Sequence, residues 1–337
     1  MVWYLRSCCP FTKFTYLEEL TLKEFRGPCA ILGLPDTLTK LNFVKLDESL
    51  KGLVLPTSLR VLDMGHDFNH PIGQGVLPRG LLELKLGTFF DQPIGKDVLP
   101  NSLQKLRLGN FNWVMERDVL PSSLLELQFG SCFNQTIGQG VLPPSLRKLS
   151  LGWRFNQPLG RNVLPSDLLQ LEFSFEFNQP IGHDVLPRGL LKLDFWGVFS
   201  QNISRGELPV SLRELNFGLS FNQPIGEHVL PSSLLCLRFG KEFNQPLVEG
   251  VLPESLLRLQ FGESFNQLIG RNVLPKGLLN LYFVWGSKFN QRIGVGVLPT
   301  GLIELRFGKD FNKSNFLVDV LPSSLKELRL GKDFYYG

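Results

Sequence analysis

The sequence contains few of the side chains that bind metals or carry out catalysis. Of its 337 residues only 4 are histidine and 5 are cysteine. None of the histidines has a partner at the spacing of a metal site or a catalytic triad, and each occupies a variable position; they are His66, His70, His183 and His228. The composition therefore predicts no metal, no cofactor and no enzymatic activity.

The cysteines are odd in number and irregularly spaced, which argues against a disulfide framework. They are Cys8, Cys9, Cys29, Cys132 and Cys236. We interpret them as free thiols in a reducing compartment, which predicts a cytoplasmic location with the nucleus as the alternative. No apolar run reaches the roughly 18 residues of a membrane span. Arg6 interrupts the first ten residues, so they lack a signal-peptide core.

The chain also lacks a strong charge of either sign. Lys and Arg total 35 against 31 Asp and Glu, a net charge of +4. A nucleic-acid or anionic-membrane binder normally concentrates basic residues on one surface. The charge balance argues against those partners and favours a protein partner.

What the chain does contain is one phrase, F-N-Q-P-I-G-x-x-V-L-P-x-S-L-x-x-L-x-F-G-x-x, repeated with a period of 22 residues. The first Phe of the phrase recurs at Phe68, Phe90, Phe111, Phe133, Phe155, Phe177, Phe199, Phe221, Phe243, Phe265, Phe289 and Phe311. A fixed period in this range is typical of a solenoid, in which each unit packs only on its neighbours.

The segment S-L-x-x-L-x-F-G predicts a β-strand. In one copy Leu237 and Phe239 face inward, Cys236 and Arg238 face solvent, and Leu234 turns inward where the strand begins. The rest of the phrase has too many prolines and glycines for a helix, so we expect an extended return segment. The Asn after the first Phe of each phrase is expected to lie inside the coil and to bond backbone groups of its own coil and the next, forming an asparagine ladder.

These features predict an all-β solenoid with one long parallel sheet of about 15 strands, one for each copy of the strand motif. Residues 1–30 are expected to form a cap or irregular first coil, and residues 31–337 a single repeat domain. The chain stops in mid-phrase at Phe334–Gly337 with no evident cap, so we expect one of three cases: a fragment of a longer protein, an end covered by a partner, or self-association through the uncapped C-terminal end.

The strand motif L-x-x-L-x-F resembles that of leucine-rich repeats, and the whole phrase resembles the FNIP repeat family over about residues 34–333. This resemblance implies a leucine-rich-repeat-like solenoid that serves as an interaction module. Many relatives carry an N-terminal F-box, which implies substrate recognition for a ubiquitin ligase. Here the residues before Leu34 are too few for a complete F-box, and Tyr16–Leu22 already has the pattern of a strand. The resemblance implies an adaptor or substrate-recognition scaffold that is not catalytic.

Solvent-facing strand positions before the central Leu alternate in sign along the repeats, as in Glu83, Lys105, Glu126 and Lys148. This alternation predicts a charge-paired, soluble sheet face. The positions around the central Leu of the last coils are more basic and include a tyrosine. They are Arg238, Arg258, Tyr282, Arg306 and Arg329. They form a candidate patch for an acidic ligand, such as a phosphorylated peptide, a nucleic acid or a lipid headgroup. The alternative is ordinary surface charge in which Glu304 and Glu327 pair with Arg306 and Arg329.

The turn after the strand is apolar in four adjacent coils and polar in the coils around them. The apolar residues are Trp153, Phe175, Trp196 and Leu219, and Trp285 lies in a two-residue insertion further along. We interpret these residues as a rim that binds a partner. The alternative is that the rings fold back and cover the edge of the core.

Overall fold

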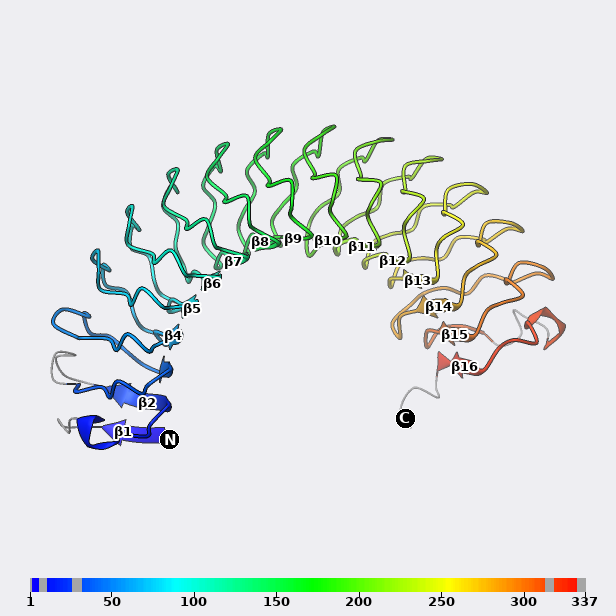
Figure 1. Cartoon of the computed structure of the whole chain (residues 1–337). Helices are drawn as coiled ribbons and strands as arrows, with labels where there is room; N and C mark the ends of the chain where they lie inside the picture. Colours follow the sequence, from blue (N-terminus) through cyan, green and yellow to red (C-terminus); the bar gives the residue numbers. More distant parts are fainter. Residues whose placement is uncertain (1, 6–10, 26–31, 313–317, 332–337) are drawn as a thin grey trace. The chain divides into compact units, whose positions relative to one another are not determined.

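A computed structural model of the chain describes residues 2–5, 11–25, 32–312 and 318–331. It divides into two units, residues 1–168 and 169–337. In each unit one side of every coil is a strand and the other side is a long return segment (Figure 1). The C-terminal residues Phe334–Gly337 and the cysteines Cys8, Cys9 and Cys29 lie outside the described residues.

The strands of each unit follow chain order and are parallel. In the first unit they are β1 (Val2–Leu5), β2 (Glu19–Phe25), β3 (Lys40–Phe43), β4 (Val61–Asp63), β5 (Glu83–Lys85), β6 (Lys105–Arg107), β7 (Glu126–Gln128) and β8 (Lys148–Ser150). In the second they are β9 (Gln170–Phe173), β10 (Lys192–Phe195), β11 (Glu214–Asn216), β12 (Cys236–Arg238), β13 (Arg258–Phe261), β14 (Asn280–Phe283), β15 (Glu304–Phe307) and β16 (Glu327–Leu330). Among the described residues the helical segments are short 3-10 turns, such as η1 (Phe11–Lys13) and η4 (Val318–Val320).

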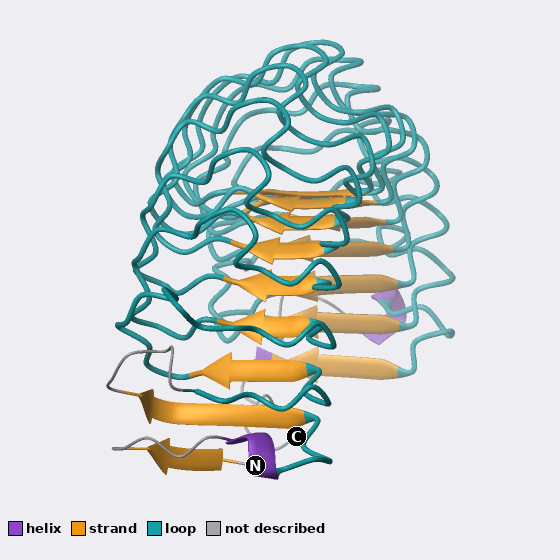
Figure 2. Cartoon of the chain, turned by 60° about the vertical axis from the view of Figure 1, so that its left-hand side comes forward, coloured by secondary structure: helices purple, strands orange, loops and turns teal. Residues whose placement is uncertain are grey.

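The predicted all-β parallel solenoid with non-helical returns is therefore confirmed (Figure 2). The strand count differs slightly from the sequence count, because β1 forms without any copy of the phrase. It pairs in parallel with β2, and β2 pairs with β3. Residues 1–30 thus contribute two strands to the sheet, and whether they also cap the solenoid stays a prediction.

The core forms because identical residues stack in register. Leu193, Leu215 and Leu237 are register partners on successive strands, and each is fully buried. Leu234 is also fully buried at the entrance of its strand, as the sequence predicts. Large apolar side chains repeated at one place in every coil merge into a continuous core, although one coil alone could not bury them.

Phenylalanine forms two columns inside this core. In the second unit the ring of Phe243 lies 3.7 Å from that of Phe239 in its own coil. It also stacks on the first Phe of the coils before and after it, Phe221 at 6.2 Å and Phe265 at 6.1 Å between centroids. Near-parallel rings at these distances add attraction to the area that they bury.

The predicted asparagine ladder is confirmed, although its side chains are half-buried or exposed rather than internal. The backbone N–H of Asn266 donates to Asn244 Oδ1 at 2.9 Å, and the N–H of Asn244 donates to Asn222 Oδ1 at the same distance. The following Gln joins the ladder, since Gln267 Nε2 donates to both oxygens of Asn244. Asp91 replaces one Asn and still accepts a bond from the N–H of Asn112.

A serine ladder also links the coils. The hydroxyl of Ser233 donates to the carbonyl of Leu212, and Ser255 donates to Leu234, each at 2.7 Å. The same bond recurs in most coils that contain the L-P-x-S-L motif. These bonds occupy carbonyl groups where the return segment meets the strand, and backbone groups at such bends need partners.

The position just before Val-Leu-Pro adopts left-handed backbone geometry. Glycine takes it in some coils, as at Gly75, while Asp97, Asn162 and His228 take it elsewhere with φ of 62, 61 and 61°. Short polar side chains tolerate this region better than most residues. The structure therefore accounts for His228 as a turn residue.

Candidate functional site

The solvent-facing side of β10 and β11 carries a small charged network. Lys192 Nζ lies 3.4 Å from Asp194 Oδ2 and 3.7 Å from Glu214 Oε2. Asn216, the register partner of Asp194, donates its amide N–H to the same carboxylate. Burial opposes the charge on Lys192, yet the carboxylates of Asp194, Glu214 and Glu172 outweigh it and raise the pKa of the lysine. Asp194 is only 6% exposed, so these contacts largely enclose a residue that the sequence placed in solvent.

Beside this network is a hollow of about 340 Å³ at the carboxyl ends of β10 to β12. Two exposed apolar side chains border it, Trp196 at 61% and Leu219 at 44% exposure. Gly218 also borders the hollow and adds no side chain. The polar side of the hollow is formed by Lys192, Asp194 and Asn216 of the network above, together with Arg238 and Gln260. The hollow thus joins part of the predicted rim to the strand face.

Trp196 and Leu219 reach the hollow from different positions of the repeat. By the register of β10 and β11, Trp196 occupies the place of Gly218, and Leu219 comes one residue later. Phe175 occupies the place of Leu219 and is half-buried. The two rim residues that border the hollow therefore occupy adjacent positions of the repeat. Trp196 stands where the next coil has Gly218, and Leu219 stands where the preceding coil has Gly197.

The other predicted rim residues lie apart from this hollow. Trp285 is 41% exposed, and the ammonium group of Lys309 lies 5.2 Å from the centre of its ring. Trp153 is 52% exposed and belongs to the first unit. Exposed Phe89 and Trp113 in that unit were missed, although Trp113 stands where the phrase has Gln and so breaks the pattern.

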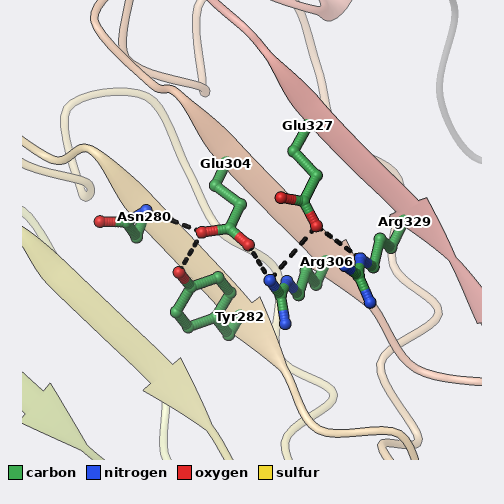
Figure 3. Close-up of polar contacts among 6 residues, drawn as sticks. All are labelled: Asn280, Tyr282, Glu304, Arg306, Glu327 and Arg329. Carbon is green, nitrogen blue, oxygen red and sulfur yellow. Dashed lines mark hydrogen bonds and ion pairs between the residues drawn. The ribbon is translucent and has the colours of Figure 1, made fainter. Parts of the chain in front are cut away.

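Two of the four arginines in the basic patch predicted at the C-terminal coils are neutralised. Arg306 contacts the carboxylates of both Glu304 and Glu327, and Arg329 contacts Glu327 (Figure 3). These are the pairings that the alternative interpretation predicts. Because each guanidinium in this network faces a carboxylate, Arg306 and Arg329 add little positive potential to the surface.

Arg238 and Arg258 differ from that pair, because neither has a carboxylate partner among the described residues. They lie on adjacent strands and border a hollow of about 80 Å³ together with Cys236, Gln260 and Tyr282. Burial raises the pKa of the Cys236 thiol, although both arginines oppose the shift. At neutral pH the thiol stays protonated, and the small hollow carries the positive charge of the two arginines.

Tyr282 links the two sets of arginines. Its hydroxyl donates to the Glu304 carboxylate, which also accepts a bond of 3.0 Å from Asn280 (Figure 3). Partial burial, and then the bond to Glu304, raise the pKa of Tyr282 to about 12. Burial opposes ionisation of Glu304, but the bonds from Tyr282, Arg306 and Asn280 lower its pKa overall.

This arrangement predicts a late phenol titration. Subtracting the alkaline absorbance titration of Tyr282→Phe from that of the parent chain should give a midpoint near 12 rather than the ordinary 10.0. Replacing Glu304 with Gln should lower that midpoint, because the carboxylate charge disappears. Since the folded pKa is the higher one, the contribution of Tyr282 to stability is present below pH 10.0 and is lost as the pH rises toward 12. A difference midpoint at the ordinary value would contradict the hydrogen bond.

No group of three or more His, Cys, Asp or Glu side chains lies close enough to hold a metal ion in residues 2–5, 11–25, 32–312 and 318–331. Over the same residues, no helix has the length and apolar character needed to cross a membrane.

A parallel sheet of identical short strands, closed by extended returns and locked by side-chain ladders, defines a leucine-rich-repeat-like β-solenoid. The chain belongs to the FNIP repeat family. The family model matches six segments that together cover most of the sequence, namely residues 47–89, 90–132, 133–176, 199–242, 243–284 and 289–333. No curated protein matches the chain.

Among solved structures, the chain is similar to CroV588, a giant-virus protein described as a novel circular LRR protein. The two share 43% sequence identity over 94% of this chain, with a TM-score of 0.81. The match covers 50% of CroV588, so the chain spans half the length of that relative. It is also similar in fold to TLR13 in its complex with ssRNA13, at 17% identity over 93% of this chain and 46% of that one, with a TM-score of 0.54.

Proposed function

We propose that the chain is a non-catalytic scaffold, an adaptor or substrate-recognition module, that binds a protein partner at the strand face of its second unit. The observation that supports this proposal is the hollow of about 340 Å³ between exposed Trp196 and Leu219. An exposed tryptophan beside an open hollow with a polar wall has the composition of interaction hot spots. The buried residues of the phrase, in contrast, serve the coil itself.

The proposal is tested by placing a photoreactive amino acid at Trp196 or at Leu219 in the full chain, which is expressed in cells of its source organism. Irradiation should yield the same discrete crosslinked protein from both positions. Leu268 is the matched control, because it is 65% exposed but lies in a return segment. Crosslinking that is equal at Leu268, or absent at both rim positions, would contradict the proposal.

The second arm uses Trp196→Ala combined with Leu219→Ser. Exposed substitutions of this kind usually change stability by less than about 0.5 kcal/mol. The variant should therefore fold normally and lose most of the crosslinked partner when the photoreactive group is placed at Phe175. Undiminished recovery from a folded variant would show that binding does not depend on this rim.

A further inference from the structure

The two hollows of the second unit are neighbours. Arg238 and Gln260 line both the larger hollow beside Trp196 and the smaller one beside Arg258. Trp196 and Leu219 follow β10 and β11, whereas Arg238 and Arg258 lie on β12 and β13. An apolar site and a cationic site thus adjoin on one exposed face, side by side across the strands.

The charge on this face changes from one end to the other. Around β10 and β11 the single Lys192 is shared by two carboxylates, those of Asp194 and Glu214. On β12 and β13 the two guanidinium groups have no carboxylate partner within the described residues, and beyond them Arg306 is held by Glu304. An anionic group is therefore favoured over Arg238 and Arg258 and disfavoured beside Trp196.

We infer that this face recognises an extended acidic peptide segment of the partner, and this inference rests on the proposed function. A bulky apolar side chain of the peptide lies between Trp196 and Leu219. An Asp or Glu carboxylate of the peptide lies between Arg238 and Arg258. Planar guanidinium groups suit a planar carboxylate. A monoanion fits better than a phosphate dianion, because the carboxylates of Glu214 and Glu304 flank the small hollow on either side. Glu214 is the register partner of Cys236, and Glu304 bonds Tyr282.

The strand geometry sets the separation of the two groups on the peptide. The middle of the apolar pair lies two strands from the middle of the arginine pair, which is about 10 Å at roughly 4.8 Å per strand. Along the strands, Trp196 and Leu219 lie three and four residues past the central Leu, whereas Arg238 and Arg258 flank it, an offset of about 12 Å at roughly 3.3 Å per residue. The two groups are therefore about 15 Å apart on the diagonal, which an extended peptide of the same rise covers in four or five positions.

The inference is tested by selecting a random peptide library displayed on phage against the whole purified chain. Sequences with Trp, Phe or Leu four or five positions from Asp or Glu should be enriched. Fluorescein-labelled peptides with the core Trp-Ser-Gly-Ser-Glu then measure the affinity by polarisation. Replacing the Glu with Gln, or the Trp with Ser, should weaken binding about tenfold or more, as for close charge pairs and buried anchors. A phosphoserine in place of the Glu should bind more weakly than Glu.

Charge reversal of the protein provides the matched comparison. The double variant Arg238→Glu, Arg258→Glu should weaken the Glu peptide about tenfold or more and spare the Gln peptide. Arg205→Glu reverses one charge at an exposed position of a return segment and should leave binding unchanged.

Three outcomes would overturn the inference. Selected peptides without acidic residues, or binding that is insensitive to reversal of Arg238 and Arg258, would remove the acidic motif. If such binding still depended on Trp196 and Leu219, the proposed function would stand. If no selected peptide is sensitive to the arginine reversal or to substitution of Trp196 and Leu219, this face has no peptide site. The crosslinking experiment would then decide the proposed function separately.

Discussion

Replacing Phe243 with alanine is expected to lower the free energy of unfolding by about 3–5 kcal/mol, the range for deleting a buried aromatic ring. The ring is fully buried and contacts a ring in its own coil and rings in both neighbouring coils. Its removal therefore opens a cavity that spans three coils. Urea unfolding followed by circular dichroism measures the loss.

Phe89→Ala is the matched control for this experiment, because it is the same chemical change at a side chain that is 51% exposed. It should change stability by about 0.5 kcal/mol or less. Since coils of a solenoid are stabilised by their neighbours, the Phe243 variant should also unfold less cooperatively, with the coils on the two sides separating into distinct transitions. Equal losses in the two variants would show that the phenylalanine column does not hold the coils together.

The second large effect is expected at the glycine that ends a strand. A Cβ at Gly130 would lie 1.5 Å from the carbonyl oxygen of Gly109 and 2.6 Å from that of Leu108. Both atoms belong to the backbone of the preceding coil, so no side-chain rotation can relieve the clash. We expect Gly130→Ala to cost about 3 kcal/mol or more, at or above the usual range for overpacking.

Gly95→Ala separates this clash from the general effect of losing a glycine. A Cβ at Gly95 meets nothing within 4 Å, and its backbone is not left-handed. That variant should be neutral or slightly stabilising, because alanine restricts the unfolded chain. Chemical denaturation of both variants gives the comparison, and a Gly130 variant as stable as the Gly95 variant would mean that the coils can move apart at little cost.

The glycine at the end of most strands has a structural role that the sequence alone did not predict. A Cβ at Gly240 would lie 1.7 Å from the carbonyl oxygen of Gly218, so glycine is needed there because the preceding coil packs against the same backbone. The recurrence of this glycine in the sequence does not reveal that contact. Likewise the sequence assigns the Ser of L-P-x-S-L only to the predicted strand segment. The structure shows that its hydroxyl bonds the preceding coil.

The candidate site was predicted less completely than the coil. The sequence identified Trp196 and Leu219 because they break the phrase, and it identified the arginines because they cluster late in the chain. It could not separate Arg238 and Arg258 from Arg306 and Arg329. That separation depends on which carboxylate each guanidinium reaches, and Glu304 and Glu327 reach only the latter pair among the described residues.

The sequence by itself determined the path of the coil, the identity of the core residues and the register of the strands. A strict period leaves one way to bury the same apolar residues in every turn, so these features are local and repetitive. The tertiary structure decided which surface charges cancel, how far Asp194 is enclosed and where the apolar rim meets an open hollow. Those properties depend in part on contacts between side chains about one repeat apart, such as Lys192 with Glu214 and Arg306 with Glu327, which exist only once neighbouring coils have stacked.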